Sequence, residues 1–203
     1  MVYVGSADNN VYAISLVTGD EVWRFGTGSP ILGACAVAGD RVFAANEDGI
    51  LYVLDAAGGE QIATFETDGQ IKGPINRFAV QSSRRVVFGS YDGSVYCVDT
   101  SSGNQVWQYQ TDNYVNGGVA ISTDRPGGQK AVFGGCDAFV HVLDASDGSA
   151  IAKADSGAYI AGSAAVSQGA VYVGNYDGIL LKADIESGSI LWQWQSEKPL
   201  LVR

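Results

Sequence analysis

The sequence is poor in the residues from which metal sites and nucleic-acid interfaces are usually built. It contains one histidine and three cysteines, and Cys35, Cys97 and Cys136 form no Cys-x-x-Cys pair. This excludes a zinc site of the usual ligand spacing, and the odd count leaves at least one thiol unpaired within the chain. Only 12 basic residues stand against 22 acidic ones, a formal net charge of −10. A field of that sign repels phosphate, which argues against a nucleic acid as partner.

Long hydrophobic runs are lacking as well, and so is the pattern of a long amphipathic helix. No stretch approaches the roughly 18 apolar residues that a membrane-spanning helix needs, and Met1 runs directly into the strand-like residues 2–4. We therefore expect neither a membrane span nor a signal peptide within this sequence. Glycine is abundant instead, with 27 residues, beside ten tyrosines and four tryptophans. This composition is typical of an all-β protein with many turns.

Five similar segments repeat along the chain, such as VYVGSADNNVYAIS from Val2 and VYVGNYDGILLKAD from Val171. An aspartate marks each unit, at positions 8, 48, 92, 137 and 177, and a glycine follows eleven residues later, at Gly19, Gly59, Gly103, Gly148 and Gly188. A period of 40 to 45 residues with only strand signals predicts four short strands per unit, the size of a β-propeller blade. We therefore predict an all-β propeller of about five four-stranded blades.

Each marking aspartate begins a predicted hairpin turn. In three units glycine follows the aspartate, as in Asp48-Gly49, and this pair between β-branched and aromatic residues predicts a type I′ turn with positive φ at both residues. Asp8-Asn9 fits the same turn. Asp137-Ala138 does not, because alanine resists positive φ, and we expect a different turn type there.

The innermost strand of each later unit is expected at a short stretch that ends in glycine, at residues 31–33, 71–73, 115–117 and 160–162. Glycine suits this place because strands crowd toward the axis of a propeller. The chain opens on the second strand of a unit and ends on residues 198–203, which align with the start of an inner strand.

This phase predicts how a ring could close. Three strands from the start and one from the end would complete one blade and remove both free sheet edges. We therefore expect a single domain of residues 1–203 with blade repeats near 1–28, 29–69, 70–113, 114–156 and 157–198, closed by residues 199–203. The same phase also arises by chance in a fragment of a larger propeller.

A longer motif runs from the third strand of a unit to its fourth. Its best copies are Ala13-x-Ser15-x-x-Thr18-Gly19-x-x-x-Trp23 and Cys97-x-Asp99-x-x-Ser102-Gly103-x-x-x-Trp107, with a third tryptophan, Trp192, after Asp184 and Gly188. The motif resembles the tryptophan-docking motif A-x-D-x-x-T-G-x-x-x-W of the pyrroloquinoline-quinone-like (PQQ-like) repeat family. Alanine replaces the tryptophan in the other two units, at Ala63 and Ala152.

Physically this motif is a packing device. The tryptophan offers a large flat ring to bury between adjacent blades, and the carboxylate and hydroxyl groups can accept backbone N–H groups in the turn. The resemblance covers essentially the whole chain and implies the propeller architecture.

Several activities share this architecture, so the resemblance does not select one. The family includes quinoprotein alcohol dehydrogenases, an outer-membrane assembly lipoprotein and extracytoplasmic sensor domains, which implies an extracytoplasmic or periplasmic setting. Its quinoprotein enzymes form eight-bladed rings that hold a quinone and a calcium ion, and the alcohol dehydrogenases carry a vicinal cysteine pair. Here there are five units and no Cys-Cys dipeptide. We therefore expect no enzyme, no catalytic residue, no bound PQQ or calcium, and no metal site.

The candidate binding residues lie in and around the predicted inner strands and the loops that enter them, at the mouth of the channel. Polar or aromatic side chains stand there where other units have mostly apolar or small ones: Lys72, Asn76, Arg77, Asn113, Tyr114, Asn116 and Tyr159. Such a mouth on a rigid scaffold can bind a protein or a small molecule, although ordinary solvated loops show the same composition.

The remaining chemically active residues are expected to be structural. His141 stands where three other units have tyrosine, so we expect a packed strand residue without a catalytic partner. Cys35 and Cys97 are expected to be buried, and Cys136, next to a turn, to be the most exposed thiol.

These patterns lead to one hypothesis and two alternatives. The hypothesis is a non-enzymatic scaffold that binds a protein or ligand through its loop face. The alternatives are a quinone-binding module related to PQQ-dependent dehydrogenases, and a designed or excised part of a larger propeller without an activity of its own.

Overall fold

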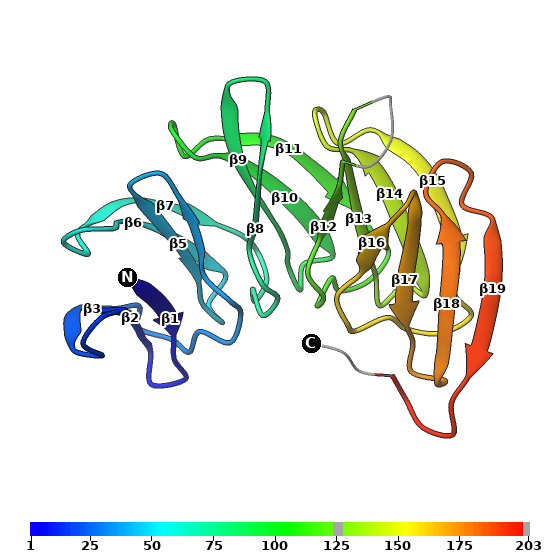
Figure 1. Cartoon of the computed structure of the whole chain (residues 1–203), viewed down its shortest axis with the longest axis horizontal. Coiled ribbons are helices and arrows are strands. Elements are labelled where there is room, and N and C mark those ends of the chain that lie inside the picture. Colours follow the sequence, from blue (N-terminus) through cyan, green and yellow to red (C-terminus); the bar gives the residue numbers. More distant parts are fainter. Residues whose placement is uncertain (124–127, 201–203) are drawn as a thin grey trace.

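The computed structural model describes residues 1–123 and 128–200, and within them it contains nineteen β-strands and no helix. The strands form five antiparallel sheets, which follow one another along the chain and stand side by side in an open arc (Figure 1). We number these sheets blades 1 to 5. The predicted all-β fold with five blades is confirmed. No helix in the described part of the chain could span a membrane.

Within each blade the strands are neighbours in chain order. Blade 1 has β1 (Val2–Gly5), β2 (Asn10–Ile14) and β3 (Glu21–Gly26). Blade 2 has β4 (Ala36–Ala38), β5 (Arg41–Ala45), β6 (Ile50–Asp55) and β7 (Gln61–Glu66). Blade 3 has β8 (Asn76–Val80), β9 (Ser83–Gly89), β10 (Ser94–Asp99) and β11 (Gln105–Gln110). Blade 4 has β12 (Ala120–Ser122), β13 (Lys130–Gly134), β14 (Phe139–Asp144) and β15 (Ala150–Asp155). Blade 5 has β16 (Ala165–Ser167), β17 (Ala170–Gly174), β18 (Ile179–Asp184) and β19 (Ile190–Gln195).

The hydrophobic core is a series of layers between blades. Val11 and Ala13, which alternate with outward residues of β2, pack with Val42, Ala44 and Leu54 of blade 2. We call the side of a blade that contacts the next blade its forward face, and the opposite side its rear face. Because side chains alternate along a strand, every interior blade buries both faces, which explains its continuous apolar strands.

The predicted inner strands are displaced. Residues 31–33 and their equivalents are connectors outside any strand, and the innermost strands β4, β8, β12 and β16 begin further along the chain. The N–H of Ile31 donates to Ser6 O, in the turn of the preceding blade, at 3.1 Å. This N–H group is therefore not available to a sheet ladder. The crowding argument for glycine holds, since a Cβ on Gly33 would lie 2.1 Å from Gly73 O of the next connector.

The hairpin turns also differ from the prediction. Only the second residue of each pair has positive φ, as at Gly49 (81°), Asn9 (71°) and Ala138 (70°). The N–H groups of Gly49 and Ala138 both donate to a carbonyl three residues earlier, at 3.2 Å. This pattern fits a type I turn followed by a left-handed residue. The prediction of a type I′ turn is therefore wrong, and so is the prediction of a separate turn type at Ala138. The paired strands on either side of the turn hold Ala138 in the same left-handed conformation as the second turn residue of the other blades.

The predicted ring closure is not found in the described residues. Blade 1 consists of β1 to β3, and in Figure 1 it stands apart from blade 5 at the other end of the arc. The N–H of Leu200 donates to Asn175 O at 3.0 Å, just as Ile31 bonds to the turn of its own preceding blade. Leu200 thus follows the course of an interior connector on blade 5 and does not join β1. The rest of the predicted closing strand, residues 201–203, lies outside the described residues.

Candidate functional site

The inner loop face is built from two repeated rows, the connectors between blades and the hairpin turns. In blades 2 to 5 the residue before the marking aspartate donates its backbone N–H to the connector that enters its blade. The pairs are Glu47 with Pro30 O, Tyr91 with Gln70 O, Cys136 with Tyr114 O, and Tyr176 with Tyr159 O, at 2.9 to 3.0 Å. These bonds hold each connector against the hairpin turn of its blade, so that equivalent residues of successive connectors lie next to one another.

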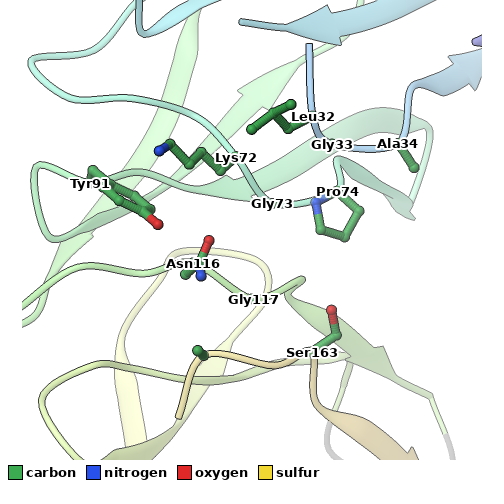
Figure 2. A pocket seen from close by; sticks show the side chains of 11 residues that line it. Leu32, Gly33, Ala34, Lys72, Gly73, Pro74, Tyr91, Asn116, Gly117 and Ser163 are labelled. Atoms are coloured by element: carbon green, nitrogen blue, oxygen red, sulfur yellow. The ribbon is translucent and has the colours of Figure 1, made fainter. Parts of the chain in front are cut away.

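A cavity of about 250 Å³ lies where these connectors converge (Figure 2). Leu32, Lys72, Asn116 and Ala161 occupy the same position in four successive connectors, and all four line it. Backbone around the connector glycines forms much of the remaining wall, with Tyr91, Pro74 and Ser163. The repeat thus places one variable side chain from every junction at one site.

Lys72 is the only charged residue among the described residues that line this cavity. Its ammonium group lies 3.0 Å from the Glu47 carboxylate and 4.9 Å from the centre of the Tyr91 ring. The Tyr91 ring in turn stacks on Tyr114, with centroids 4.9 Å apart and planes at 9°. An ion pair and a cation–π contact therefore orient Lys72 while its head group keeps partial exposure to solvent.

Asn116 and Ser163 supply polar groups on the other side. In Figure 2 the Asn116 side chain is drawn between Tyr91 and Ser163. The Ser163 hydroxyl accepts the N–H of Gly118 at 2.9 Å. The cavity therefore combines a cation, an amide and a phenol ring on backbone that is fixed by hydrogen bonds.

The other predicted binding residues lie outside the cavity. The Asn76 amide donates to Val119 O at 2.6 Å and links β8 to the segment before β12. Arg77 is exposed on β8, the Asn113 side chain accepts the N–H of Tyr114 at 2.8 Å, and Tyr159 is exposed on its connector. Of the seven candidates, the structure places Lys72 and Asn116 in the cavity wall and Tyr114 behind Tyr91.

Sequence reasoning missed Tyr91, Glu47 and Ser163. The signal for the first two was available, because both precede a marking aspartate and therefore share one repeat position. Ser163 carried no such signal, since it follows a connector glycine among small residues.

The cavity does not fit a quinone held by calcium. None of the residues that line it in the described structure is an aspartate or glutamate, whereas calcium takes carboxylate and carbonyl oxygens. Across residues 1–123 and 128–200, no three His, Cys, Asp or Glu side chains form a group that could hold a metal ion.

His141 is buried, as predicted, but it has a partner that the sequence analysis did not foresee. Its Nε2 lies 3.0 Å from the Asp137 carboxylate, its Nδ1 lies 3.3 Å from the Tyr109 hydroxyl, and its ring stacks on Phe133. Burial lowers the pKa of His141, and the Asp137 carboxylate opposes that shift. Tyrosine at the same place in blade 3, Tyr96, donates to its own turn aspartate at 2.8 Å. The histidine thus performs the structural task of the tyrosine.

The thiols are not activated. Burial raises the pKa of Cys35 to about 11 and that of Cys97 to about 12, and it also raises the pKa of Cys136. Cys97 is fully buried, while Cys35 and Cys136 are both partly exposed. A nucleophilic role needs a lowered pKa, so the geometry assigns these cysteines to packing.

The docking motif works as predicted in two of its three tryptophan copies. Trp23 and Trp107 are buried, but Trp192 is 41% exposed because no blade follows its sheet. The Asp99 carboxylate accepts the N–H groups of Ser101 and Ser102, both at 2.9 Å, and hydrogen bonds of this kind lower its pKa. Asp184 accepts N–H groups in the equivalent turn of blade 5.

Solved structures share this fold at low sequence identity. BamB from Moraxella catarrhalis superposes with a TM-score of 0.79 at 19% identity, over 97% of this chain and 61% of that one. The computationally designed Ika8 protein superposes with a TM-score of 0.82 at 20% identity, over 98% of this chain and 60% of that one. The chain thus spans about three fifths of each. No curated protein sequence matches it.

The sequence itself matches a family model of PQQ-like repeats described as outer membrane protein assembly factor BamB. The match covers residues 1–124 and again residues 92–203, which together include the whole chain. The chain therefore belongs to this BamB-like family of PQQ-like repeat propellers.

Proposed function

We propose that this protein is a non-enzymatic scaffold that binds a partner protein on its inner loop face, at the cavity lined by Lys72, Tyr91 and Asn116. The observation that carries the proposal is the convergence of a cation and an amide, from one repeat position of successive connectors, with an aromatic stack beside them. Rigid backbone around these groups lowers the entropy cost of binding.

The size of the cavity favours a protein segment over a whole small-molecule ligand. Its volume of about 250 Å³ is below the range of about 300–1,000 Å³ that is typical of ligand pockets. Around it the loop face exposes Tyr114, Tyr159 and Tyr176. Exposed tyrosines are enriched in protein interfaces, so one inserted side chain with flanking contacts on these rings suits the surface. A small ligand in the cavity is the alternative.

The charge of the site also favours a protein partner. Glu47 neutralises Lys72, so the cavity itself carries no excess charge in a chain with net charge −10. The ammonium group has three donors, and a partner's carboxylate or main-chain carbonyl can accept one without displacing Glu47. The description of the family as an assembly factor supports a protein partner as well.

A peptide selection tests the proposal. Peptides displayed on phage are selected on the immobilised protein and counter-selected on a Lys72→Ala/Asn116→Ala variant. We expect the enriched peptides to bind the wild-type chain at least tenfold more tightly than the double variant, by fluorescence anisotropy. An Arg77→Ala control, at an exposed residue of β8 that does not line the cavity, should bind like the wild type. Peptides that bind all three proteins equally would refute the site.

The quinone alternative is tested separately. Protein incubated with PQQ and calcium is expected to gain neither the quinone absorbance after gel filtration nor a higher melting temperature. Retention of the quinone with a raised melting temperature would replace the scaffold proposal by the quinone-binding module.

A further inference from the structure

A second hollow, of about 300 Å³, lies beside the cavity on the inner loop face. It is lined by the hairpin turn of blade 3 and by the connector that leaves this blade, at residues 91–93 and 110–114. Tyr91 lines the hollow and the cavity alike. A partner segment that enters the cavity is therefore within reach of this hollow.

Two carboxylates line the hollow, and only one of them is occupied within the protein. Asp92 accepts the N–H of Ser94 and the hydroxyl of Tyr96, both at 2.8 Å. Asp112 is exposed, and within residues 1–123 and 128–200 no basic side chain forms an ion pair with it. The hollow therefore offers one carboxylate to a cation from outside.

The Tyr114 ring gives the hollow an aromatic wall. It stacks on Tyr91, with centroids 4.9 Å apart, and Tyr114 is nevertheless 51% exposed. The stack covers one face of the Tyr114 ring, and the rest of the ring is open to solvent. No basic side chain of the described residues lies over this ring.

The combination of a carboxylate with a tyrosine occurs at this connector alone. The equivalent pairs of positions hold Gly28 and Pro30, Asp68 and Gln70, Asp112 and Tyr114, Gly157 and Tyr159, and Glu197 and Pro199. Asp68 thus has no ring at the paired position, and Tyr159 has no carboxylate there. The other connectors fold without this combination, so the blade architecture does not require it.

Elsewhere the protein completes such a pair of groups with a cation of its own. In three places a basic side chain lies over an aromatic ring and against a carboxylate: Lys72 with Tyr91 and Glu47, Lys153 with Phe139 and Asp137, and Arg24 with Tyr12 and Glu21. Tyr114 and Asp112 supply the ring and the carboxylate of a fourth set. The cation is the component that a ligand would bring.

We propose that this hollow binds an arginine side chain of the partner, with the guanidinium stacked on Tyr114 and paired with the Asp112 carboxylate. A guanidinium group is planar and weakly hydrated, and its parallel N–H groups match a carboxylate, so it suits this site better than an ammonium group does. The net charge of −10 also attracts a basic segment. The inference rests on the proposed function, because it names the chemistry of the partner that enters the neighbouring cavity.

Titration with Nα-acetyl-arginine amide tests this subsite directly. Binding is followed through the backbone amide NMR signals of residues 110–114, at a salt concentration near physiological. Nα-acetyl-lysine amide, which keeps the charge, and Nα-acetyl-citrulline amide, which keeps the planar shape, are the comparison ligands. Asp112→Asn and Tyr114→Leu each remove one group of the site. Asp68→Asn is the matched control, at a connector without the ring.

We expect the arginine ligand to shift these signals and to bind about threefold more tightly than the lysine ligand, while the citrulline ligand should not bind. Asp112→Asn and Tyr114→Leu should each weaken arginine binding about threefold or more, and Asp68→Asn should leave it unchanged. Equal binding of the arginine and lysine ligands, or undiminished binding to Asp112→Asn, would show a diffuse attraction to the acidic surface and overturn the inference.

The peptides selected on the cavity separate this inference from the proposed function. Peptides that bind through Lys72 and Asn116 are expected to carry an arginine whose replacement by citrulline weakens binding to the wild type but not to Asp112→Asn. Selected peptides without such an arginine, together with no binding of the arginine ligand, refute the inference and leave the proposed function standing. Arginine binding at Asp112 with a failed peptide selection refutes the proposed function and keeps the arginine subsite.

Discussion

Replacing Trp107 by alanine should cost far more stability than the same replacement at Trp192, although both residues occupy the same motif position. Trp107 is 5% exposed, packs between blades 3 and 4 and donates to Ala145 O at 3.1 Å. Removal of a buried tryptophan leaves a cavity and costs about 3–5 kcal/mol. Trp192 is 41% exposed and contacts no following blade, so its loss should cost about 1 kcal/mol or less.

Urea unfolding followed by far-UV circular dichroism measures the difference. With an m-value of about 2–3 kcal/mol/M for a chain of this size, Trp107→Ala should lower the midpoint by on the order of 1–2 M. Trp107→Phe should lie between, because it keeps a six-membered aromatic ring and loses the five-membered ring of the indole together with its hydrogen bond, which is worth about 1 kcal/mol. Equal midpoints for the alanine variants at the two positions would show that packing between blades does not carry the stability of the arc.

Three further predictions concern single residues. Gly117→Ala should destabilise the chain by about 1–3 kcal/mol in the same unfolding assay, because its Cβ would lie 2.1 Å from a carbonyl oxygen of the next connector, while Gly26→Ala, with 3.8 Å to its nearest neighbour, should be nearly neutral. The lowered pKa of His141 means that the folded state resists its protonation, so stability should be complete above pH 6.5 and fall as the pH decreases below it. His141→Tyr should flatten that part of a midpoint-against-pH curve, and an unchanged slope would contradict the assignment. Cys97 should react with iodoacetamide only on unfolding, after Cys136, and mass spectrometry of timed samples should show this order.

The repeat itself was predictable because each unit solves the same local problem with the same residues. Turn aspartates accept backbone N–H groups wherever they stand, as Asp99 does, and the motif tryptophans fill the space between blades. The alignment placed Lys72 at the inner mouth, although it predicted an inner strand at residues 71–73 where the structure has a connector. These features depend on short-range geometry, which the spacing of residues encodes directly.

Features that depend on the neighbouring blade were not predictable in the same way. Ala138 takes a left-handed conformation because the paired strands on both sides fix its turn, against its own preference. The inner strands begin later than expected because connector N–H groups bond to the previous blade's turn. Likewise, the contact of Lys72 with Glu47 joins residues from two repeats, and a single unit contains no sign of it.

At the two junctions without tryptophan, other side chains contact the turn of the next blade. At the second junction Ala63 leaves the space, and Arg41, at the start of β5, reaches forward to donate to Ser101 O at 2.9 Å in the turn of blade 3. At the fourth junction the ammonium of Lys130, at the start of β13, lies 2.7 Å from the Glu186 carboxylate in the turn of blade 5.

Each interior junction therefore brings a donor from one blade to the turn of the next, whether the donor is an indole, a guanidinium or an ammonium group. A buried turn carbonyl without a donor is costly. Basic donors are not confined to the junctions without tryptophan, because Arg85 donates to Ser146 O at 2.6 Å at the third junction, beside Trp107. By the same argument, a surface that covers the turn of residues 15–19 must bring such a donor to it. The exposed face of blade 1 is thus apolar, and a surface that covers it must also supply a hydrogen-bond donor.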